Sequence, residues 1–283
     1  MAELGDKDAD MYGLDALLYL MQRLRAPEDG CPWDIEQTFK TVVPSTIEEA
    51  YEVADAIERG DLTGLQEELG DHLFQAVFYC QLAAEEDRFD MPMVIDTLVR
   101  KLIRRHPHVF PDGTLESRRD MDSGSHKQSV SQAWETIKQE ERNNRGLEGV
   151  FDDVPKASPA LSRAQKIQKR AAKQKFDWES ISPVYEKIQE EISELDQAVA
   201  SQDRDAIEDE IGDLFFSCVN LARHLKIDSE TALRRSTNKF MARYSVMLSE
   251  FEKTCPNDSF ESLSPEQMDV LWRKAKVHAQ AGK

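Results

Sequence analysis

The chain has 283 residues and a formal net charge of −18 at pH 7. Its length exceeds one typical domain and suits two. Hydrophobic residues make up 40% of the chain and charged residues 32%, a balance typical of a real core under a heavily charged surface. The negative charge argues against a general binder of nucleic acid or of anionic membranes. We therefore expect neither nucleic acid nor membrane among its partners.

Glycine and proline are few, 12 and 11 residues, which favours long helices and an all-α fold. The cysteines are scattered without a CxxC pair, as is typical of reduced thiols in a cytosolic protein; they are Cys31, Cys80, Cys218 and Cys255. The N-terminus is acidic and no apolar run could span a bilayer. These features predict a cytoplasmic protein.

The first predicted helix covers residues 14–24, where leucine and methionine recur at helical spacing. A loop with specific polar side chains follows at residues 31–38 and contains Trp33. A tryptophan beside acids and amides can stack on a planar base, or it can close the end of a helical bundle. The sequence leaves both interpretations of Trp33 open.

A helical hairpin is predicted over residues 45–86. Gly60 ends its first helix and Asp61 caps its second, so the two helices run antiparallel. The second helix carries an apolar stripe that we expect to face the core, namely Leu69, Leu73, Phe74, Val77 and Phe78.

The hairpin also carries two pairs of acids, each pair three residues apart and so on one helix face. Counted outward from Gly60, the pairs lie at matching heights on the neighbouring helices, which predicts that four carboxylates converge: Glu49, Glu52, Glu68 and Asp71. Such a group is unfavourable unless a cation neutralises it. All-oxygen ligation favours Mg²⁺, with Mn²⁺ as an alternative.

The chain contains this arrangement twice. A constant offset of 142 positions maps the four acids onto Glu191, Glu194, Glu210 and Asp213. One such set in an acidic chain could be an ordinary solvated helix surface, but the repeated spacing argues against accident. Glu48 and Glu190 precede the first ligand of each set, and each can serve as the base that activates a water.

A second set of repeats follows each hairpin at an offset of 138 positions. Lys101, Arg105 and Trp134 of the first half correspond to Lys239, Arg243 and Trp272 of the second half. Metal-binding acids with a basic pair fit a polyphosphate substrate. We expect two helical repeats, 10–145 and 157–279, with a linker at about 144–158.

Two other interpretations remain open from the residues alone. A carboxylate-bridged di-iron bundle would need Glu-x-x-His on two helices; His72 follows Asp71, but Leu214 stands at the equivalent place in the second copy. A non-catalytic helical interaction scaffold would carry the same acids merely as solvated charges.

The motifs in this order resemble the all-α nucleoside triphosphate pyrophosphohydrolases and, within them, the two-domain bacterial MazG family. The resemblance covers most of residues 14–276 and rests on EExxE and ExxD together with Cys31-Pro32-Trp33-Asp34, Arg105-His106-Pro107-His108 and Arg163-Ala164-Gln165-Lys166. It implies hydrolysis of nucleoside triphosphates to monophosphates and pyrophosphate, with Mg²⁺ on the two acid sets.

The resemblance also implies site residues, and the small size of each unit implies an assembly. Lys239, Arg243 and Trp272 match positions that contact the nucleotide, with Lys101, Arg105 and Trp134 as first-copy counterparts. The C-terminal unit of such two-copy proteins is the more secure catalytic one. A single hairpin pair buries little surface, so we expect a homodimer.

Overall fold

A computed structural model describes residues 11–118, 127–144, 146–147, 149–255 and 259–281, without the side chains of 127–133, 135, 139 and 278–281. Every regular element in these ranges is a helix, and none is both long and apolar enough to cross a membrane. The chain divides into two compact units, Met1–Lys138 and Gln139–Lys283. The division falls within α6 (Lys127–Asn144). The all-α tandem architecture predicted from the sequence is confirmed.

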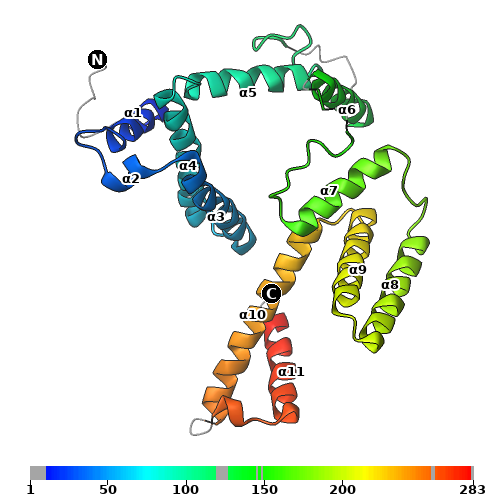
Figure 1. The fold of residues 1–283 in the computed structure, drawn as a ribbon. Coiled ribbons are helices and arrows are strands. Elements are labelled where there is room, and N and C mark those ends of the chain that lie inside the picture. Colours follow the sequence, from blue (N-terminus) through cyan, green and yellow to red (C-terminus); the bar gives the residue numbers. More distant parts are fainter. Residues whose placement is uncertain (1–10, 119–126, 145, 148, 256–258, 282–283) are drawn as a thin grey trace. The chain divides into compact units, whose positions relative to one another are not determined.

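The first unit is organised around a long helical hairpin (Figure 1). Its elements before α6 are α1 (Leu14–Leu24), α2 (Pro32–Glu36), α3 (Phe39–Arg59), α4 (Leu62–Glu85) and α5 (Met91–Arg105). The predicted bounds of α1 are confirmed. The expected loop at 31–38 contains the short helix α2, which Pro32 opens with a backbone dihedral already suited to a first helical position.

The turn of the hairpin is the one that the sequence predicts. Gly60 ends α3 with φ +69°, in the left-handed region, and the Asp61 side chain accepts a hydrogen bond of 2.9 Å from the Gly64 backbone N–H. Helix α3 begins six residues earlier than expected, because the Thr38 side chain caps it by accepting from the Thr41 backbone N–H.

The core of the first unit lies at the end of the hairpin that is remote from Gly60. Met21 of α1 packs with Val77 and Phe78 of α4, which confirms the predicted core positions of those two residues. The prediction was wrong for Leu69 and Leu73, whose exposed fractions are 51% and 45%. They lie nearer the turn, whereas the core that α1 helps to build contains the later part of α4.

The second unit repeats the hairpin and adds helices on either side. Its elements after α6 are α7 (Ala160–Lys173), α8 (Ser182–Ser201), α9 (Arg204–His224), α10 (Ser229–Thr254) and α11 (Pro265–Ala281), with a short 3₁₀ helix, η1 (Phe260–Ser262). Asp203 caps α9 by accepting from the Ala206 backbone N–H at 3.2 Å. Gln202 has the left-handed φ of +58° that Gly60 has in the first unit.

Two buried glutamines of α7 tie the second unit together. Gln165 Nε2 donates to the Ile227 carbonyl at 2.7 Å, and Gln165 Oε1 accepts from the Ser229 backbone N–H at 3.0 Å. Gln168 Nε2 donates to the Phe216 carbonyl at 2.8 Å. These bonds fix α7 against α9 and against the start of α10.

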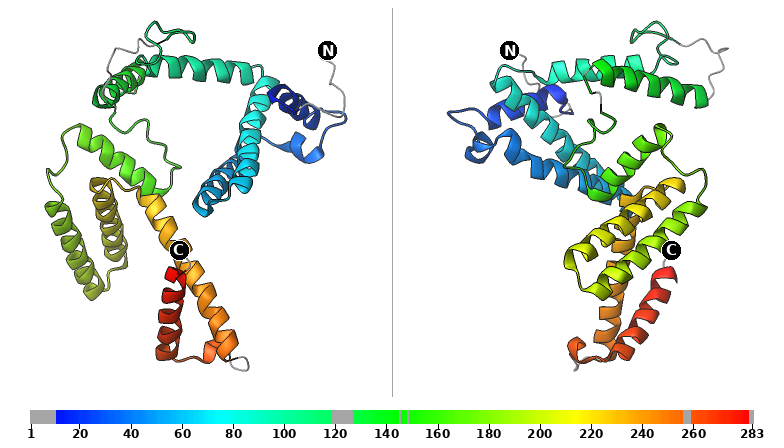
Figure 2. Two further views of the ribbon diagram at one scale, coloured as in Figure 1. Left: turned by 180° about the vertical axis from the view of Figure 1, so that it is seen from behind. Right: turned by 45° about the vertical axis from the view of Figure 1, so that its right-hand side comes forward.

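The helix after each hairpin leads away from it. Figures 1 and 2 show α5 diverging from α3–α4, and α10 diverging from α8–α9. The second half of α10 packs instead on α11, where Met247, Phe251, Leu271 and Ala275 form a separate small core. The residues predicted to bind phosphate lie on these diverging helices.

The Gly60 backbone gives a direct test of the hairpin turn. A Cβ at Gly60 would meet no atom within 4 Å, so the left-handed φ alone decides the effect of Gly60→Ala. We expect this change to lower the free energy of unfolding by about 1 kcal/mol, measured by urea denaturation followed by circular dichroism.

Gly70→Ala is the matched control, because Gly70 lies inside α4 and its Cβ would also meet nothing within 4 Å. Here alanine should stabilise by about 0.5–1 kcal/mol. Equal effects of the two changes would contradict the assigned turn.

Candidate metal centres and active site

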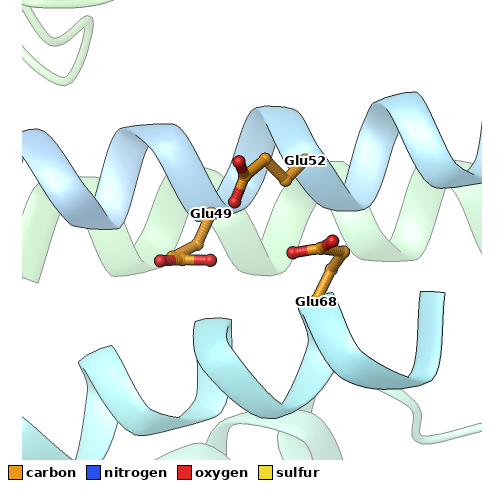
Figure 3. Close-up of side chains that lie close together, drawn as sticks. All are labelled: Glu49, Glu52 and Glu68. Carbon is orange, nitrogen blue, oxygen red and sulfur yellow. The ribbon is translucent and has the colours of Figure 1, made fainter. Parts of the chain in front are cut away.

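Three carboxylates of the first hairpin point toward one another (Figure 3). Glu49 and Glu52 come from α3 and Glu68 from α4, and one oxygen of each lies within 4.8 Å of the others. We call this group the first cluster. The hairpin produces it because residues three apart share a helix face and the turn sets the two helices in register.

The second hairpin builds an equivalent group. Glu191 and Glu194 of α8 and Glu210 of α9 also offer oxygens within 4.8 Å of one another, and we call them the second cluster. The repeat at an offset of 142 positions is therefore a repeat in space. It places two sets of hard oxygen donors of the kind that Mg²⁺ and Mn²⁺ prefer.

The fourth acid predicted for each site lies outside the close group. Asp71 and Asp213 are exposed, and neither belongs to the oxygens within 4.8 Å. Each is still near enough to act electrostatically: Asp71 contributes to the raised pKa of Glu49, and Asp213 to that of Glu210. The structure thus brings together three of the four predicted ligands in each unit.

Electrostatics indicate that the first cluster is short of positive charge. Burial raises the pKa of Glu49, and the charges of Asp71 and Glu52 raise it further. Glu49 Oε2 is buried without a hydrogen-bond partner among the described residues. A buried carboxylate oxygen in that state is costly. A divalent cation would supply both the missing charge and the missing contact, so the donor set fits a metal.

The second cluster contains a lysine that the sequence interpretation missed. Lys187 Nζ lies 2.8 Å from Glu191 Oε1 and donates to Glu190 Oε1 at 2.8 Å. These bonds raise the pKa of Lys187. The first unit has Ser45 at the equivalent position. The spacing of Lys187 from Glu191, one helical turn, was the signal that could have identified it.

The predicted catalytic bases flank the clusters. Glu190 is exposed and bound to Lys187. Glu48 is exposed at a shallow hollow on α3, which Tyr51 and Glu52 also line. Each base precedes the first cluster acid of its helix by one residue, so it points to an adjacent helix face rather than into the cluster.

The predicted phosphate-binding residues lie apart from the acids of their own unit. Lys101 and Arg105 stand in the later part of α5, and Lys239 and Arg243 in the middle of α10, on the helices that lead away from the hairpins (Figures 1 and 2). Arg243 Nε is buried without a hydrogen-bond partner among the described residues.

The predicted tryptophans have separate surroundings. Trp272 packs on Phe240 with 5.2 Å between the ring centroids, and Lys138 Nζ lies 3.8 Å from the centroid of the Trp134 ring. Trp33 is 62% exposed, so it does not close the end of a bundle within a single chain.

One histidine of the first unit, His106, has a structural role at the end of a helix. His106 ends α5, and its Nδ1 lies 2.6 Å from the Leu102 carbonyl oxygen. Within the described ranges, neither carboxylate cluster includes a histidine. The di-iron interpretation, which requires one, therefore has no support from the geometry.

A cavity of about 630 Å³ adjoins the second cluster. Lys187 and Glu191 of α8 and Asp213 of α9 lie along it, and α7, the rest of α9, the segment between α7 and α8, and Phe151 provide the remaining walls. Sequence patterns did not point to this cavity, because its lining comes from segments far apart along the chain.

Known proteins resemble this chain over nearly its whole length. The MazG nucleotide pyrophosphohydrolase domain matches residues 37–110 and 180–247. The "Nucleoside triphosphate pyrophosphohydrolase" of Escherichia coli (strain K12) is 46% identical over 272 residues, which are 94% of this chain and 98% of that protein. The "Nucleoside triphosphate pyrophosphohydrolase/pyrophosphatase MazG" of Thermotoga maritima is 42% identical over 93% of this chain and 95% of that protein.

The raised pKa of Glu49 predicts how stability depends on pH. A carboxyl group whose pKa is higher in the folded state stabilises the fold at low pH, and this contribution is lost as the pH rises through the raised value. Glu49→Gln should therefore raise the melting temperature of the metal-free protein at about pH 7, and the gain should shrink toward about pH 4.

Mg²⁺ should raise the melting temperature of the unmodified protein at neutral pH, and Glu49→Gln should reduce that response. Glu28→Gln, a change at an exposed acid outside the cluster, is the control. The assignment of the first cluster would be contradicted if Glu49→Gln lowered the melting temperature of the metal-free protein and left the response to Mg²⁺ as large as in the unmodified protein.

Proposed function

The chain belongs to the MazG nucleotide pyrophosphohydrolase family, and we propose that it hydrolyses nucleoside triphosphates to nucleoside monophosphates and pyrophosphate. The observation that supports this function best is the pair of carboxylate clusters, each built from two helices at the same spacing. The cytoplasm, where nucleoside triphosphates are made and used, is the proposed place of action.

The acids are the proposed metal ligands. Glu191, Glu194 and Glu210 would hold Mg²⁺, or Mn²⁺, with Asp213 completing the set; Glu49, Glu52, Glu68 and Asp71 would do so in the first unit. When bound, the cation neutralises charge on the phosphate oxygens and on the leaving pyrophosphate. This role explains why the chain concentrates so many like charges at two places.

Glu190 is the proposed general base of the second unit, and Glu48 its counterpart in the first. Glu190 takes a proton from a water whose oxygen bonds to the α-phosphorus, and the bond from that phosphorus to the bridging oxygen of the β-phosphate breaks. Lys187 lies between Glu190 and Glu191. It orients the base and offers a positive charge to the triphosphate.

We propose the second unit as the main catalytic one. Its cluster adjoins a cavity large enough for a small ligand and includes Lys187. The repeat boundaries remain our proposal, 10–145 and 157–279; the division between Lys138 and Gln139 falls inside the first proposed repeat, seven residues before its end.

A homodimer is the proposed active form, because Lys239 and Arg243 lie on a helix that leads away from the acids of their own chain. Lys239, Arg243 and Trp272 lie on or against α10, which leads away from the second cluster (Figure 1). The hairpin also exposes large apolar side chains, among them Ile192, Ile211 and Phe215. A second copy that covers this face could bring its α10 cations to the acids; Lys101, Arg105, Trp33 and Trp134 would serve the first unit in the same way.

Pyrophosphate release in the presence of Mg²⁺ tests the reaction and the role of each unit. Glu194→Gln should lower the rate by about a hundredfold or more, because it removes a metal ligand. Glu52→Gln should leave most of the rate. Glu186→Gln, an exposed change on α8, should have no effect.

Loss of about half of the rate for each of Glu52→Gln and Glu194→Gln would show that both units turn over. No release by the unmodified protein from any common ribonucleotide or deoxyribonucleotide would overturn the enzymatic function and leave the helical scaffold in its place.

Mixing two inactive variants tests whether the site is shared between chains. Glu194→Gln and Lys239→Ala should each be inactive alone. After exchange of subunits, a mixed dimer would contain one site with intact acids from one chain and an intact lysine from the other. Activity should then return to roughly a quarter of the unmodified level, if subunits pair at random in a two-fold dimer.

No recovery in an exchanged mixture whose mixed dimers are verified by mass would place both residues in one chain. The two unmixed variants, taken through the same exchange, are the controls.

A further inference from the structure

The segment that links α6 to α7 contributes a wall to the second site. Phe151 of this segment lines the cavity beside the second cluster. Among the lining residues in the described part of the chain, Phe151 alone precedes α7. A linker between repeats usually makes few contacts, so a linker residue with a fixed place beside the acids requires a restraint.

Asp153, two residues after Phe151, supplies that restraint by binding two helices. Arg142 Nη1 of α6 donates to Asp153 Oδ1 at 2.5 Å, and Arg170 Nη2 of α7 donates to Asp153 Oδ2. The side chains of Arg142, Asp153 and Arg170 are only 9%, 25% and 18% exposed. Charge-assisted hydrogen bonds of this kind are stronger than neutral ones. We call these three residues the linker clamp.

Further bonds restrain the linker on the other side of Phe151. Arg142 Nη2 donates to the Gly149 carbonyl at 2.6 Å, and the Gly149 backbone N–H donates to Asp152 Oδ2 at 2.7 Å. A Cβ at Gly149 would collide with the Asp152 carboxylate, so this turn requires glycine. Val154, at the end of the segment, is buried. Phe151 therefore lies between restraints that come before and after it.

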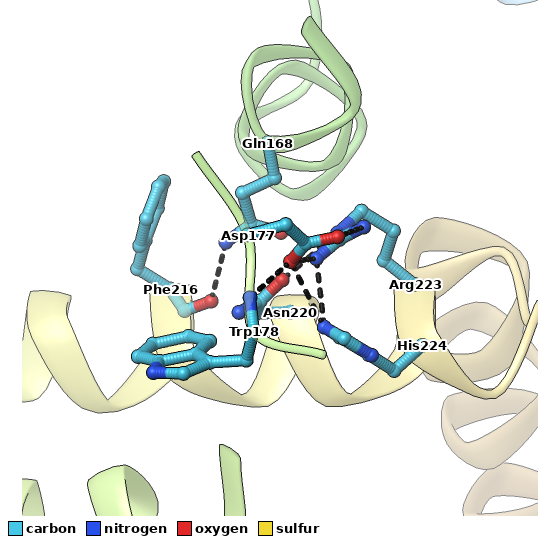
Figure 4. Close-up of polar contacts among 7 residues, drawn as sticks. All are labelled: Gln168, Asp177, Trp178, Phe216, Asn220, Arg223 and His224. Atoms are coloured by element: carbon cyan, nitrogen blue, oxygen red, sulfur yellow. Dashed lines mark hydrogen bonds and ion pairs between the residues drawn. The ribbon is translucent and has the colours of Figure 1, made fainter. Parts of the chain in front are cut away.

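The segment between α7 and α8 is held in a similar way (Figure 4). Arg223 of α9 donates from Nη1 to Asp177 Oδ2 at 2.9 Å and from Nη2 to Asp177 Oδ1, and His224 Nε2 lies 3.1 Å from Asp177 Oδ1. The bonds from Arg223 lower the pKa of Asp177. Trp178, the next residue, lines the same cavity as Phe151. On either side of α7, an aspartate bound by arginine thus precedes or follows an aromatic residue of the cavity wall.

The first unit fills the equivalent place with core side chains. Phe78 stands where the second unit has Asn220. Phe78 is 2% exposed and packs with Met21 and Val77, with the Arg25 guanidinium carbon 5.3 Å from its ring centroid. In the second unit the position is a cavity-lining amide, so a wall supplied from outside the hairpin has a space to enclose there.

We infer that Asp153 is a positioning residue of the second site, which binds Arg142 and Arg170 and thereby keeps Phe151 in the wall against which the substrate lies. The linker between the repeats is then part of the active site as well as a tether. The inference rests on the proposed function. Asp153 acts through Phe151 and does not touch the substrate. Loss of its charge therefore weakens substrate binding and leaves the chemical step at the acids intact.

Calorimetric binding of α,β-methylene ATP to the full chain in the presence of Mg²⁺ tests this inference. Asp153→Asn keeps the shape of the side chain and removes its charge, so it should weaken binding by about tenfold. Phe151→Ala should weaken binding by a similar factor. Because both changes remove the same contact, the double variant should bind no more weakly than the weaker single variant. Asp153→Asn should also raise KM for the triphosphate and change kcat less than about twofold.

Lys156→Ala, at an exposed position of the same segment, is the matched control and should leave the affinity unchanged. The inference is overturned if Asp153→Asn binds as tightly as the unmodified protein, or if the two single effects multiply in the double variant. Should Asp153→Asn fail to fold, Phe151→Ala still decides, because an unchanged affinity of that variant overturns the inference too.

The binding measurement needs no turnover, so its outcomes are distinct from those of pyrophosphate release. Failure of the unmodified protein to bind α,β-methylene ATP would overturn the proposed function, and the inference with it. Binding by the unmodified protein that Asp153→Asn and Phe151→Ala do not weaken would overturn the inference alone.

Discussion

The repulsion among carboxylates held together by a helical hairpin is the constraint on which both units depend. A turn at Gly60 or Gln202 sets two helices in register, and the register brings three acids to one place. The helix pair fixes the backbone positions of these acids, so only rotation of their side chains can increase the distance between the carboxylates. A cation bound there would stabilise the hairpin as well as provide chemistry, and would so couple folding stability to metal binding.

The two units reduce the repulsion among their carboxylates in different ways. In the second unit Lys187 places a permanent positive charge against Glu191, which is only 3% exposed. In the first unit Ser45 offers no charge, and Glu49 responds through a raised pKa. The Lys187 charge reduces the repulsion among the carboxylates of the second cluster when no metal is bound. The second unit also has an open cavity, whereas Phe78 is buried at the equivalent position of the first unit. The lysine and the cavity therefore distinguish the same site of the two units.

Sequence was sufficient for the features that depend on local spacing. The acids of each cluster and the turn at Gly60 follow from helical periodicity and from the conformational freedom of glycine. Sequence was insufficient where the outcome depends on what covers a helix. Leu69 and Leu73 have the same periodicity as Val77, but the core formed with α1 includes only the later part of α4. The cavity lining was missed because Asn220 and Gln168 come from different helices and only packing brings them together.

Association of two chains would explain two observations together. It would account for the exposed apolar faces of the hairpins and for the position of the cations away from the acids. An isolated chain would expose Ile211 and Phe215 to water, which is unfavourable, and would also present acids without their phosphate-binding partners. Association into the proposed dimer would bury Ile211 and Phe215 and would also bring the phosphate-binding residues to the acids. Hydrolysis would then depend on assembly, so that a chain exposing its hairpin face would not release pyrophosphate. The net charge of −18 would oppose such association over long distances, and the apolar contact between hairpins would have to overcome it at short range.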